Sequence, residues 1–420
     1  MTARVGNSMA HSILMVVDQL PFPPRNGVTL PTFNYAEGLM KSSRLSLVLL
    51  VDEASSVDRA ALAENEAIFG EIAVVRVRRK NKLRRVVDEL LGRDMFNQGW
   101  ECIDASAVSA EATADVLLVS PYSAAAKWLA ADTYRLDRFD CRIAAVSDCT
   151  AAEYFYRCTQ DFGGLKLRLK AWLDRIRASR VAVAEQRTLA NFDHILMQTK
   201  VDQQLMKSLV GNGVAAQVAI VPNGVRSEFF EVRRSEISRK AVFVAELSGE
   251  YASVADWLVR TVWPLVLEKS SIAELLIVGK GASAELREAI RCVGRAEHIE
   301  FVEDLRTVYE GAAVVVCPVF KGYGLINKAL EAMASGVPVV GGAAAFNGIE
   351  GFVDRVHGFV CRPRNTEDFA LAISELISNT AKAEQIGSSG RLLIKDQFLW
   401  TSTVKRIEAL MDKQKCVSGE

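Results

Sequence analysis

Metal-binding and disulfide patterns are missing from this sequence of 420 residues. It has 8 cysteines and 4 histidines, no two cysteines stand in C-x-x-C spacing, and the histidines do not cluster near the cysteines. Zinc sites and small disulfide frameworks need such spacings, so neither is predicted. Cys317 lies in an apolar run, where a free thiol behaves as a small hydrophobic side chain. We therefore expect reduced cysteines, which are typical of cytoplasmic proteins.

An excess of charge and a long apolar run are also missing. Lysine plus arginine and aspartate plus glutamate balance at 51 each, which argues against a nucleic-acid-binding protein. No stretch approaches the ~20 apolar residues of a membrane span. The apolar run 13–17 ends at Asp18 and is too short for a secretory signal. These features predict a cytoplasmic protein.

Short apolar runs alternate with helical patterns along the chain. Runs without polar alternation are typical of strands buried on both faces, and helices between them indicate parallel sheets built from βαβ units. Two series of runs lie on either side of the turn-forming segment 221–224, and the chain length favours two domains. The runs that predict strands are residues 13–17, 45–51, 72–77, 116–119, 143–146, 195–197 and 218–221, then 242–247, 275–278, 299–302, 313–316, 337–340 and 359–361.

The sequence therefore predicts an α/β protein with two Rossmann-like, doubly wound domains. The first domain is predicted to span residues 1–215, and the second residues 216–395. Residues 396–420 are predicted to form one more helix. Its apolar face would consist of Leu399, Trp400, Val404, Ile407 and Leu410. Because such a face must pack against another surface and no strand follows, we expect this helix to cross back to the first domain.

The most informative segment is residues 318–340, where a strand, a glycine turn, a helix and a second strand are predicted in succession. The turn contains Gly322 and Gly324, the helix covers residues 325–335, and Gly336 ends it. A glycine turn that opens a helix at the carboxyl end of a parallel strand is an anion site, because free N–H groups and the positive helix end face the ligand.

Three side chains of this helix carry the expected chemistry. Lys328, in the first turn, can add a positive charge beside a diphosphate. Asn327 and Glu331 are four residues apart and share a helix face, so the Glu331 carboxylate can accept hydrogen bonds from ribose hydroxyls. The alternative is that Glu331 is a solvated helix charge and the glycines only turn the chain. The predicted nucleoside-diphosphate pocket comprises Gly322, Gly324, Leu325, Asn327, Lys328 and Glu331.

The run G-x-x-N-K-x-L-E-A-M-A-x-G-x-P-V-V, residues 324–340, resembles the signature of retaining glycosyltransferases of family four. It is most similar to the subgroup that builds bacterial exopolysaccharides and other surface glycans. The resemblance implies the GT-B fold, in which two Rossmann-like domains face a cleft and the second domain binds the donor. It covers nearly the whole chain, and further landmarks are residues 13–27, 220–225, 242–247, 275–281 and 357–363.

The resemblance implies transfer of a sugar from a nucleoside-diphosphate-sugar to a glycan, lipid-linked or protein acceptor, with retention at the anomeric carbon. In such enzymes a side-chain nucleophile is not usual, and the donor phosphate oxygen is thought to assist the acceptor. No metal or other cofactor is expected, because helix dipole and lysines can neutralise the leaving diphosphate and no D-x-D cluster is present.

The chain departs from the family pattern at Tyr323, where a glutamate is frequent, and at Ala245, where glycine is usual. A basic residue after the first donor-domain strand is also missing, so Lys280 or Lys328 would have to bind the diphosphate. These departures motivate one rival function, a non-catalytic paralogue that binds nucleotide or glycan. A second rival is a sugar-nucleotide epimerase of the same architecture.

Three positions outside the pocket segment are further candidates. Gly27 follows the first strand and either approaches the donor or acceptor in the cleft or only turns the chain. Asp148 follows the run 143–146 at a strand's carboxyl end and is the candidate catalytic residue, although capping of the next helix is slightly favoured. Glu246 ends the run 242–247 and either faces the cleft or is a surface carboxylate.

Two stretches of the first half, residues 76–85 and 166–180, are strongly basic. The second interleaves lysine and arginine with leucines and Trp172, a pattern typical of helices that lie in an anionic membrane interface, at roughly 1 kcal/mol per basic residue. A peripheral contact with the inner membrane face is therefore one hypothesis. The alternative is a solvated helix whose leucines face the core of the first domain.

Overall fold

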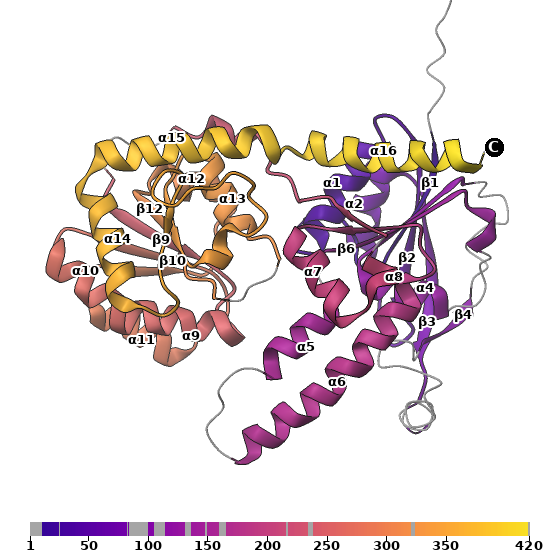
Figure 1. Cartoon of the computed structure of the whole chain (residues 1–420), viewed down its shortest axis with the longest axis horizontal. Coiled ribbons are helices and arrows are strands. Elements are labelled where there is room, and N and C mark those ends of the chain that lie inside the picture. Colours follow the sequence, from indigo (N-terminus) through magenta and orange to yellow (C-terminus); the bar gives the residue numbers. More distant parts are fainter. Residues whose placement is uncertain are drawn as a thin grey trace, which may run out of the picture. The chain divides into compact units, whose positions relative to one another are not determined.

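The chain folds into two compact units in the computed structural model (Figure 1). One unit comprises Met1–Pro222 with Trp400–Glu420, and the other comprises Asn223–Leu399. The borders fall a few residues later than residues 215 and 395. The reason is that the last strand of the first sheet ends at Ile220 and a helix of the second unit continues to Gln397.

The structure describes residues 11–24, 26–81, 83, 100–104, 114–130, 136–147, 149–158, 165–215, 217–233, 238–320 and 324–418. Two predicted site residues, Asp148 and Gly322, lie outside the described residues. Residues 82, 84 and 85 of the first basic stretch and Tyr323 also lie outside them.

The first unit is built on a mostly parallel sheet in the order β4-β3-β2-β1-β5-β6-β7-β8. Only β4 runs antiparallel, against β3. The strands are β1 (Ser12–Val17), β2 (Arg44–Asp52), β3 (Ile72–Arg79), β4 (Trp100–Asp104), β5 (Val116–Ser120), β6 (Cys141–Ser147), β7 (His194–Met197) and β8 (Val218–Ile220). The chain winds outward from β1 in one direction and then outward from β5 in the other, which confirms the doubly wound fold.

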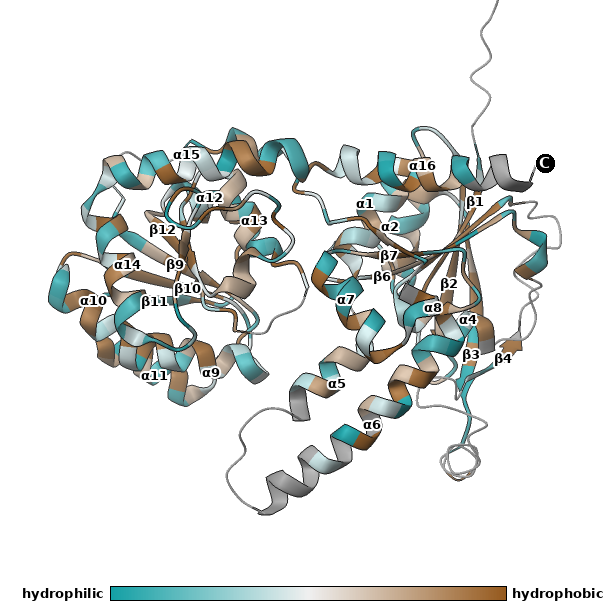
Figure 2. Cartoon of the chain, viewed as in Figure 1, coloured by the Kyte–Doolittle hydropathy of each residue, from teal (hydrophilic) through white to brown (hydrophobic). Residues whose placement is uncertain are grey.

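Helices cover this sheet, and their hydrophilic stretches contrast with the hydrophobic strands in Figure 2. β1 lies between β2 and β5, so residues 13–17 are buried on both faces and show no polar alternation. The sequence missed β4, an edge strand that pairs only with β3 and carries polar residues. The helices are α1 (Thr29–Leu39), α2 (Arg59–Phe69), α4 (Tyr122–Ala130), α5 (Thr150–Cys158), α6 (Leu165–Leu189), α7 (Lys200–Leu209), α8 (Asn212–Ala215) and α16 (Trp400–Ser418).

The second unit has a fully parallel sheet in the order β11-β10-β9-β12-β13-β14. Its strands are β9 (Lys240–Val244), β10 (Glu274–Val278), β11 (Ala296–Ile299), β12 (Val314–Cys317), β13 (Val339–Gly341) and β14 (Phe359–Val360). The winding direction reverses between β9 and β12. The helices are α9 (Gly249–Trp257), α10 (Trp263–Lys269), α11 (Ala284–Val293), α12 (Leu305–Glu310), α13 (Asn327–Ala334), α14 (Thr366–Ser378) and α15 (Thr380–Gln397).

The predicted position of β11 in the sequence was wrong. The run 299–302 predicts a strand there, but the strand covers Ala296–Ile299 and pairs through Ile299 with Val278. The next apolar side chain, Phe301, is 63 % exposed. An apolar run therefore marked the residues after the strand, because the strand itself is a polar edge strand that contains Glu297 and His298.

The last helix, α16, packs on the first unit, as predicted. Trp400, Val404 and Ile407 of the predicted face are buried there, and Met411 is buried where Leu410 is only partly buried. The Trp400 ring lies 6.0 Å from that of Tyr35. The helix begins four residues later than predicted.

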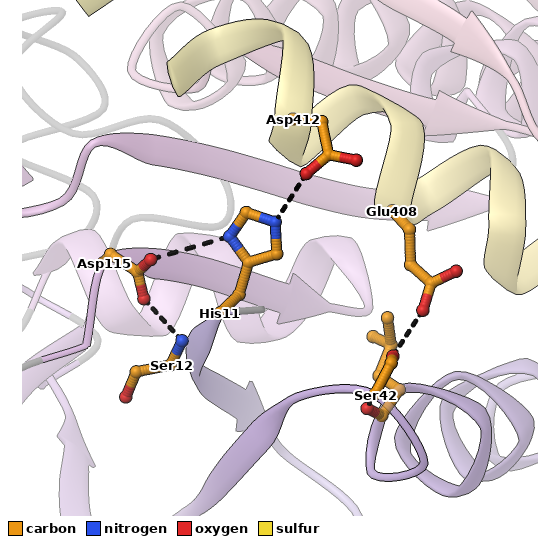
Figure 3. Close-up of polar contacts among 7 residues, drawn as sticks. His11, Ser12, Ser42, Asp115, Glu408 and Asp412 are labelled. Carbon is orange, nitrogen blue, oxygen red and sulfur yellow. Dashed lines mark hydrogen bonds and ion pairs between the residues drawn. The ribbon is translucent and has the colours of Figure 1, made fainter. Parts of the chain in front are cut away.

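Polar contacts also hold α16 to the first unit (Figure 3). The buried His11 lies between two carboxylates, with Nε2 2.9 Å from Asp412 of α16 and Nδ1 3.5 Å from Asp115. Ser42 donates a hydrogen bond to Glu408 one turn earlier in α16. Among the described residues, no helix is both long and apolar enough to cross a bilayer.

A carboxylate from a distant helix caps α5. Glu185 of α6 is fully buried and accepts the backbone N–H groups of Thr150 at 2.6 Å and Ala151 at 2.8 Å. Figure 1 shows α5 and α6 side by side. Burial raises the pKa of Glu185 to about 7, although these hydrogen bonds favour the ionised form.

Glu185→Gln is expected to flatten the dependence of stability on pH. The pKa of Glu185 in the fold, about 7, lies above its ordinary value of 4.5. The Glu185 carboxyl group therefore binds its proton more tightly in the folded state than in the unfolded state. The resulting stabilisation is fully present below pH 4.5 and is lost as the pH rises through 7. Between pH 5 and pH 8 the wild type should lose about 2 kcal/mol of unfolding free energy that the variant does not lose.

Urea unfolding at four pH values between 5 and 8 measures this difference. Glu64→Gln, on an exposed face of α2, is the matched control and should keep the wild-type pH profile. Parallel profiles for the wild type and Glu185→Gln would contradict the shifted titration of Glu185.

Candidate functional site

The predicted site residues of the second unit, the donor residues and the cleft-loop residue Glu246, follow three neighbouring strands. Glu246 comes after β9, Lys280 after β10, and the segment 324–331 after β12. β9 and β12 pair directly, and the strand order reverses between them. Open α/β sheets bind ligands outside the carboxyl ends of strands at such a reversal. The candidate site is therefore this edge of the second sheet.

The turns after β9 and β10 are held together by backbone hydrogen bonds. Ala245 N–H donates to the Val278 carbonyl at 3.0 Å, and Leu247 N–H donates to the Lys280 carbonyl at 2.7 Å. Gly279 lies between them with φ +156°, and a Cβ there would stand 1.6 Å from the Ala245 carbonyl oxygen. Only glycine fits this approach, so it fixes how the Glu246 and Lys280 turns meet.

Lys280 is exposed and lies over an aromatic ring. Its Nζ is 4.7 Å from the centre of the Phe301 ring, which follows β11. A cation over a ring face is attracted by the ring quadrupole, so the ammonium is held near the strand ends. The sequence pattern does not reveal Phe301 as a site residue, because the apolar run 299–302 predicts a buried strand.

The start of α13 has no side-chain cap from the residue at its cap position. Gly324 precedes it with φ +77°, and Ile326, at the cap position, provides no side-chain hydrogen bond to the helix. Asn327 is the first helical residue and Lys328 the second. Uncapped N–H groups and the helix dipole favour an anion at this position.

Lys328 and Glu331 form an ion pair on α13. The Lys328 Nζ lies 3.0 Å from the Glu331 Oε2, and the Glu331 side chain is only 12 % exposed. Glu331 thus occupies a mostly buried position with a cation beside it. A diphosphate at the helix start would compete with Glu331 for this lysine.

Two residues near Glu331 remain neutral. Cys317, at the end of β12, has its pKa raised to about 12 by burial, while Lys328 lowers and Glu331 raises it. Tyr309 of α12 is fully buried, and burial followed by the negative charge of Glu331 raises its pKa well above the ordinary value. A buried thiol with such a pKa is protonated at neutral pH and behaves as a small hydrophobic side chain.

Two predicted residues, Gly27 and Glu246, lie in exposed turns. Gly27 belongs to the first unit, in an exposed turn where Asn26 accepts the N–H groups of Val28 and Thr29. Glu246 is exposed and accepts a hydrogen bond from Ser248 at 3.4 Å.

One buried residue near the helix start was missed by sequence reasoning. Asn223 comes from the segment 221–224, which the sequence indicates as a turn and as part of the landmark 220–225, with no site role for this residue. Its Nδ2 donates to the Asn327 Oδ1 at 3.2 Å. The two residues are 104 positions apart, so no local pattern points to the contact.

Residues 238–379 match the protein-family model described as Glycosyl transferases group 1. An uncharacterized glycosyltransferase of Methanocaldococcus jannaschii is 26 % identical over 211 residues, which cover 45 % of this chain and 52 % of that protein. The D-inositol 3-phosphate glycosyltransferase of Mycolicibacterium smegmatis is 27 % identical over 245 residues, or 54 % of each chain. The chain thus spans about half the length of the curated relatives it matches.

Solved structures resemble the chain over nearly its full length. Anabaena HepE in complex with UDP and glucose superposes with a TM-score of 0.64 at 15 % identity, covering 96 % of this chain and 99 % of HepE. Sucrose-phosphate synthase of Thermosynechococcus elongatus gives a TM-score of 0.65 at 15 % identity, covering 97 % and 100 %. This likeness confirms the predicted fold with two Rossmann-like domains, the GT-B architecture.

Proposed function

We propose that this protein is a glycosyltransferase that moves a sugar from a nucleoside-diphosphate-sugar to an acceptor. The observation that carries the proposal is the start of α13, where an uncapped helix, Lys328 and Glu331 follow β12 at the reversal of strand order. This helix lies inside the segment that matches Glycosyl transferases group 1. UDP-sugars are the first donors to test, because the similar HepE structure holds UDP and glucose.

In the proposed mechanism the donor diphosphate lies on the N-terminus of α13. Lys328 leaves Glu331 and pairs with the diphosphate, so that helix dipole and ammonium stabilise the charge that develops on the leaving group. Glu331 then accepts hydrogen bonds from the ribose hydroxyls. Transfer proceeds with retention and without a metal, and Asp148 contacts the acceptor or the transferred sugar.

The acceptor is a glycan, a lipid-linked glycan or a protein, within bacterial surface polysaccharide or glycoconjugate synthesis. Support comes from relatives whose names give a glycolipid as the acceptor. One of them is a phosphatidylinositol monomannoside mannosyltransferase of Mycobacterium tuberculosis, 27 % identical over 220 residues. The resemblance of residues 324–340 to the surface-glycan subgroup points the same way.

A thermal-shift screen across nucleoside diphosphates and their sugars tests the proposal. A ligand at 100 times its Kd stabilises the fold by about 2.7 kcal/mol, which is readily seen as a higher Tm. Nucleotide-sugars that bind are then incubated with and without acceptors. Release of nucleoside diphosphate only with an acceptor supports transfer, a changed sugar-nucleotide without one indicates an epimerase, and binding without turnover indicates a non-catalytic protein.

Lys328→Met is expected to weaken binding of UDP by about tenfold while binding of uridine changes little. The charge-assisted contact that is lost involves only the diphosphate and is worth roughly 1.5 kcal/mol or more. Calorimetric titration of both ligands measures the difference. Lys269→Met, at the exposed end of α10, is the control. Equal losses for UDP and uridine would contradict a phosphate role for Lys328.

We further propose that the first unit contacts anionic membrane through α6. Among its described side chains, Trp172 is 58 % exposed and Arg175 is exposed. An exposed tryptophan among basic residues suits the headgroup region of a bilayer, where the indole ring is partly dry and partly wet. The basic residues of the stretch 166–180 supply the attraction to anionic lipid.

Vesicle binding is expected to be strong at low salt with anionic lipid and largely lost at high salt. The Debye length falls to about 3 Å at 1 M salt, which screens such a contact. Replacing Arg168, Lys170 and Arg175 with glutamine should reduce binding without changing activity on a soluble acceptor. Neutral vesicles are the control. A wild type that ignores anionic vesicles at low ionic strength would show that α6 is simply a solvated helix.

A further inference from the structure

The segment between β8 and the second unit is unusually buried for a connection. Residues 221–225 are all buried, and Val225 belongs to an apolar cluster of the second unit. The Val225 N–H donates to the Phe398 carbonyl at 2.7 Å, and Val225 forms a bridge with Leu399. Asn223, two residues before this anchor, is therefore held by a fixed backbone of the same unit as α13.

The Asn223 side chain is directed to the start of α13. It is 1 % exposed, and its Nδ2 donates to the Asn327 Oδ1. Its own amide oxygen is buried and has no hydrogen-bond partner among the described residues. A buried amide that served the connection itself would be expected to bond both of its polar ends locally. Within the described part of the chain, Asn327 is the side chain that it contacts by a hydrogen bond.

This contact occupies the oxygen end of the Asn327 amide. Because the Asn327 oxygen accepts the hydrogen bond from Asn223, the Asn327 NH₂ group points away from Asn223 with its two N–H donors. The cap position is occupied by Ile326, which offers no polar side chain. An anion at the start of α13 is an acceptor that suits both these donors and the backbone N–H groups there.

We propose that Asn223 is a positioning residue for the diphosphate of the donor, and that it acts by orienting the Asn327 amide. The inference rests on the proposed function and names a role for a residue that does not itself contact the ligand. A rigid partner outside the first turn keeps the amide from rotating its oxygen towards the phosphate, where two acceptors would repel each other.

A double-mutant cycle tests this role. Asn223→Ala, Asn327→Ala and the double variant are titrated with UDP, GDP and ADP and with the matching nucleosides, and the pair that the wild type binds most tightly is used. Asn223→Ala is expected to raise the Kd of the diphosphate three- to fivefold and that of the nucleoside less than twofold. In the Asn327→Ala background the same substitution should have no further effect on either Kd.

Asn223→Asp gives a second test with a side chain of the same size. Its carboxylate cannot donate to Asn327, so the Asn327 amide would turn its N–H groups to the carboxylate and its oxygen to the ligand. The Kd of the diphosphate should rise tenfold or more. Asn379→Ala removes an exposed asparagine of the same unit that caps α15, and it should lower Tm without changing either Kd.

The outcomes separate the two hypotheses. If Asn223→Ala weakens diphosphate and nucleoside equally, weakens neither, or still acts in the Asn327→Ala background, the positioning role is overturned while the proposed function stands. If the wild type binds none of the three diphosphates, the proposed function falls, and the role of Asn223 falls with it. If Asn223→Ala fails to fold, Asn223→Asp and Asn327→Ala test the positioning role instead. Each should raise the Kd of the diphosphate more than the Kd of the nucleoside, and equal changes in both would overturn the role.

Discussion

Glu331→Ala is expected to lower kcat/KM for the nucleoside-diphosphate-sugar by ten- to a hundredfold while the protein remains folded. A hydrogen bond to a charged group is worth roughly 1.5–3 kcal/mol, and each 1.4 kcal/mol is a factor of ten. The Glu331 carboxylate lies in a mostly buried position, where solvent and salt screen its interaction with the ribose hydroxyls only weakly.

The ion pair with Lys328 makes the result more specific than a simple loss. Removing the carboxylate frees Lys328 for the diphosphate, so part of the lost ribose binding is offset for nucleotides but not for nucleosides. Uridine binding should therefore fall more than UDP binding, the opposite of the order expected for Lys328→Met. Calorimetry with both ligands and steady-state kinetics with the donor measure the two effects.

Glu268→Ala, which removes an exposed carboxylate of α10 in the same unit, is the matched control for Glu331→Ala. It should leave kcat/KM and both Kd values unchanged. A well-folded Glu331→Ala variant with unchanged kcat/KM would remove Glu331 from the site and favour the interpretation of a structural helix charge.

Gly279→Ala is expected to destabilise the second unit by about 3 kcal/mol or more and to weaken nucleotide binding. The added Cβ would stand 1.6 Å from the Ala245 carbonyl oxygen, so the backbone has to move. Movement breaks the hydrogen bonds that join the turns after β9 and β10, and it displaces Lys280. Overpacking and strain at a special backbone geometry are among the mechanisms that give large losses of stability.

Urea unfolding and the Kd of UDP measure this effect. Gly311→Ala in the same unit is the control, because Gly311 has a negative φ and a Cβ there would meet only one atom, at 3.9 Å. Its effect should stay within about 1 kcal/mol. A Gly279→Ala variant as stable as Gly311→Ala would show that the two turns are not locked against each other.

Much of the fold follows from local pattern. Residues 13–17 and 275–278 are uninterrupted apolar runs, and only a strand buried on both faces keeps such a run stable in a parallel sheet. The helix after β12 depends on residues within one or two turns of each other, so its place could be predicted to within about two residues. The apolar face of α16 was predicted for the same reason.

The sequence by itself therefore determined the α/β class, the two series of strands, and the helix with Lys328 and Glu331 on it. Only the tertiary structure decided that Glu185 caps α5, that Phe301 lies under Lys280, and that Asn223 reaches Asn327. Periodicity and turn chemistry act between near neighbours in the chain and leave a local pattern. Contacts between distant residues depend on which strands pair and how closely their turns approach, and that is decided by packing across the whole sheet.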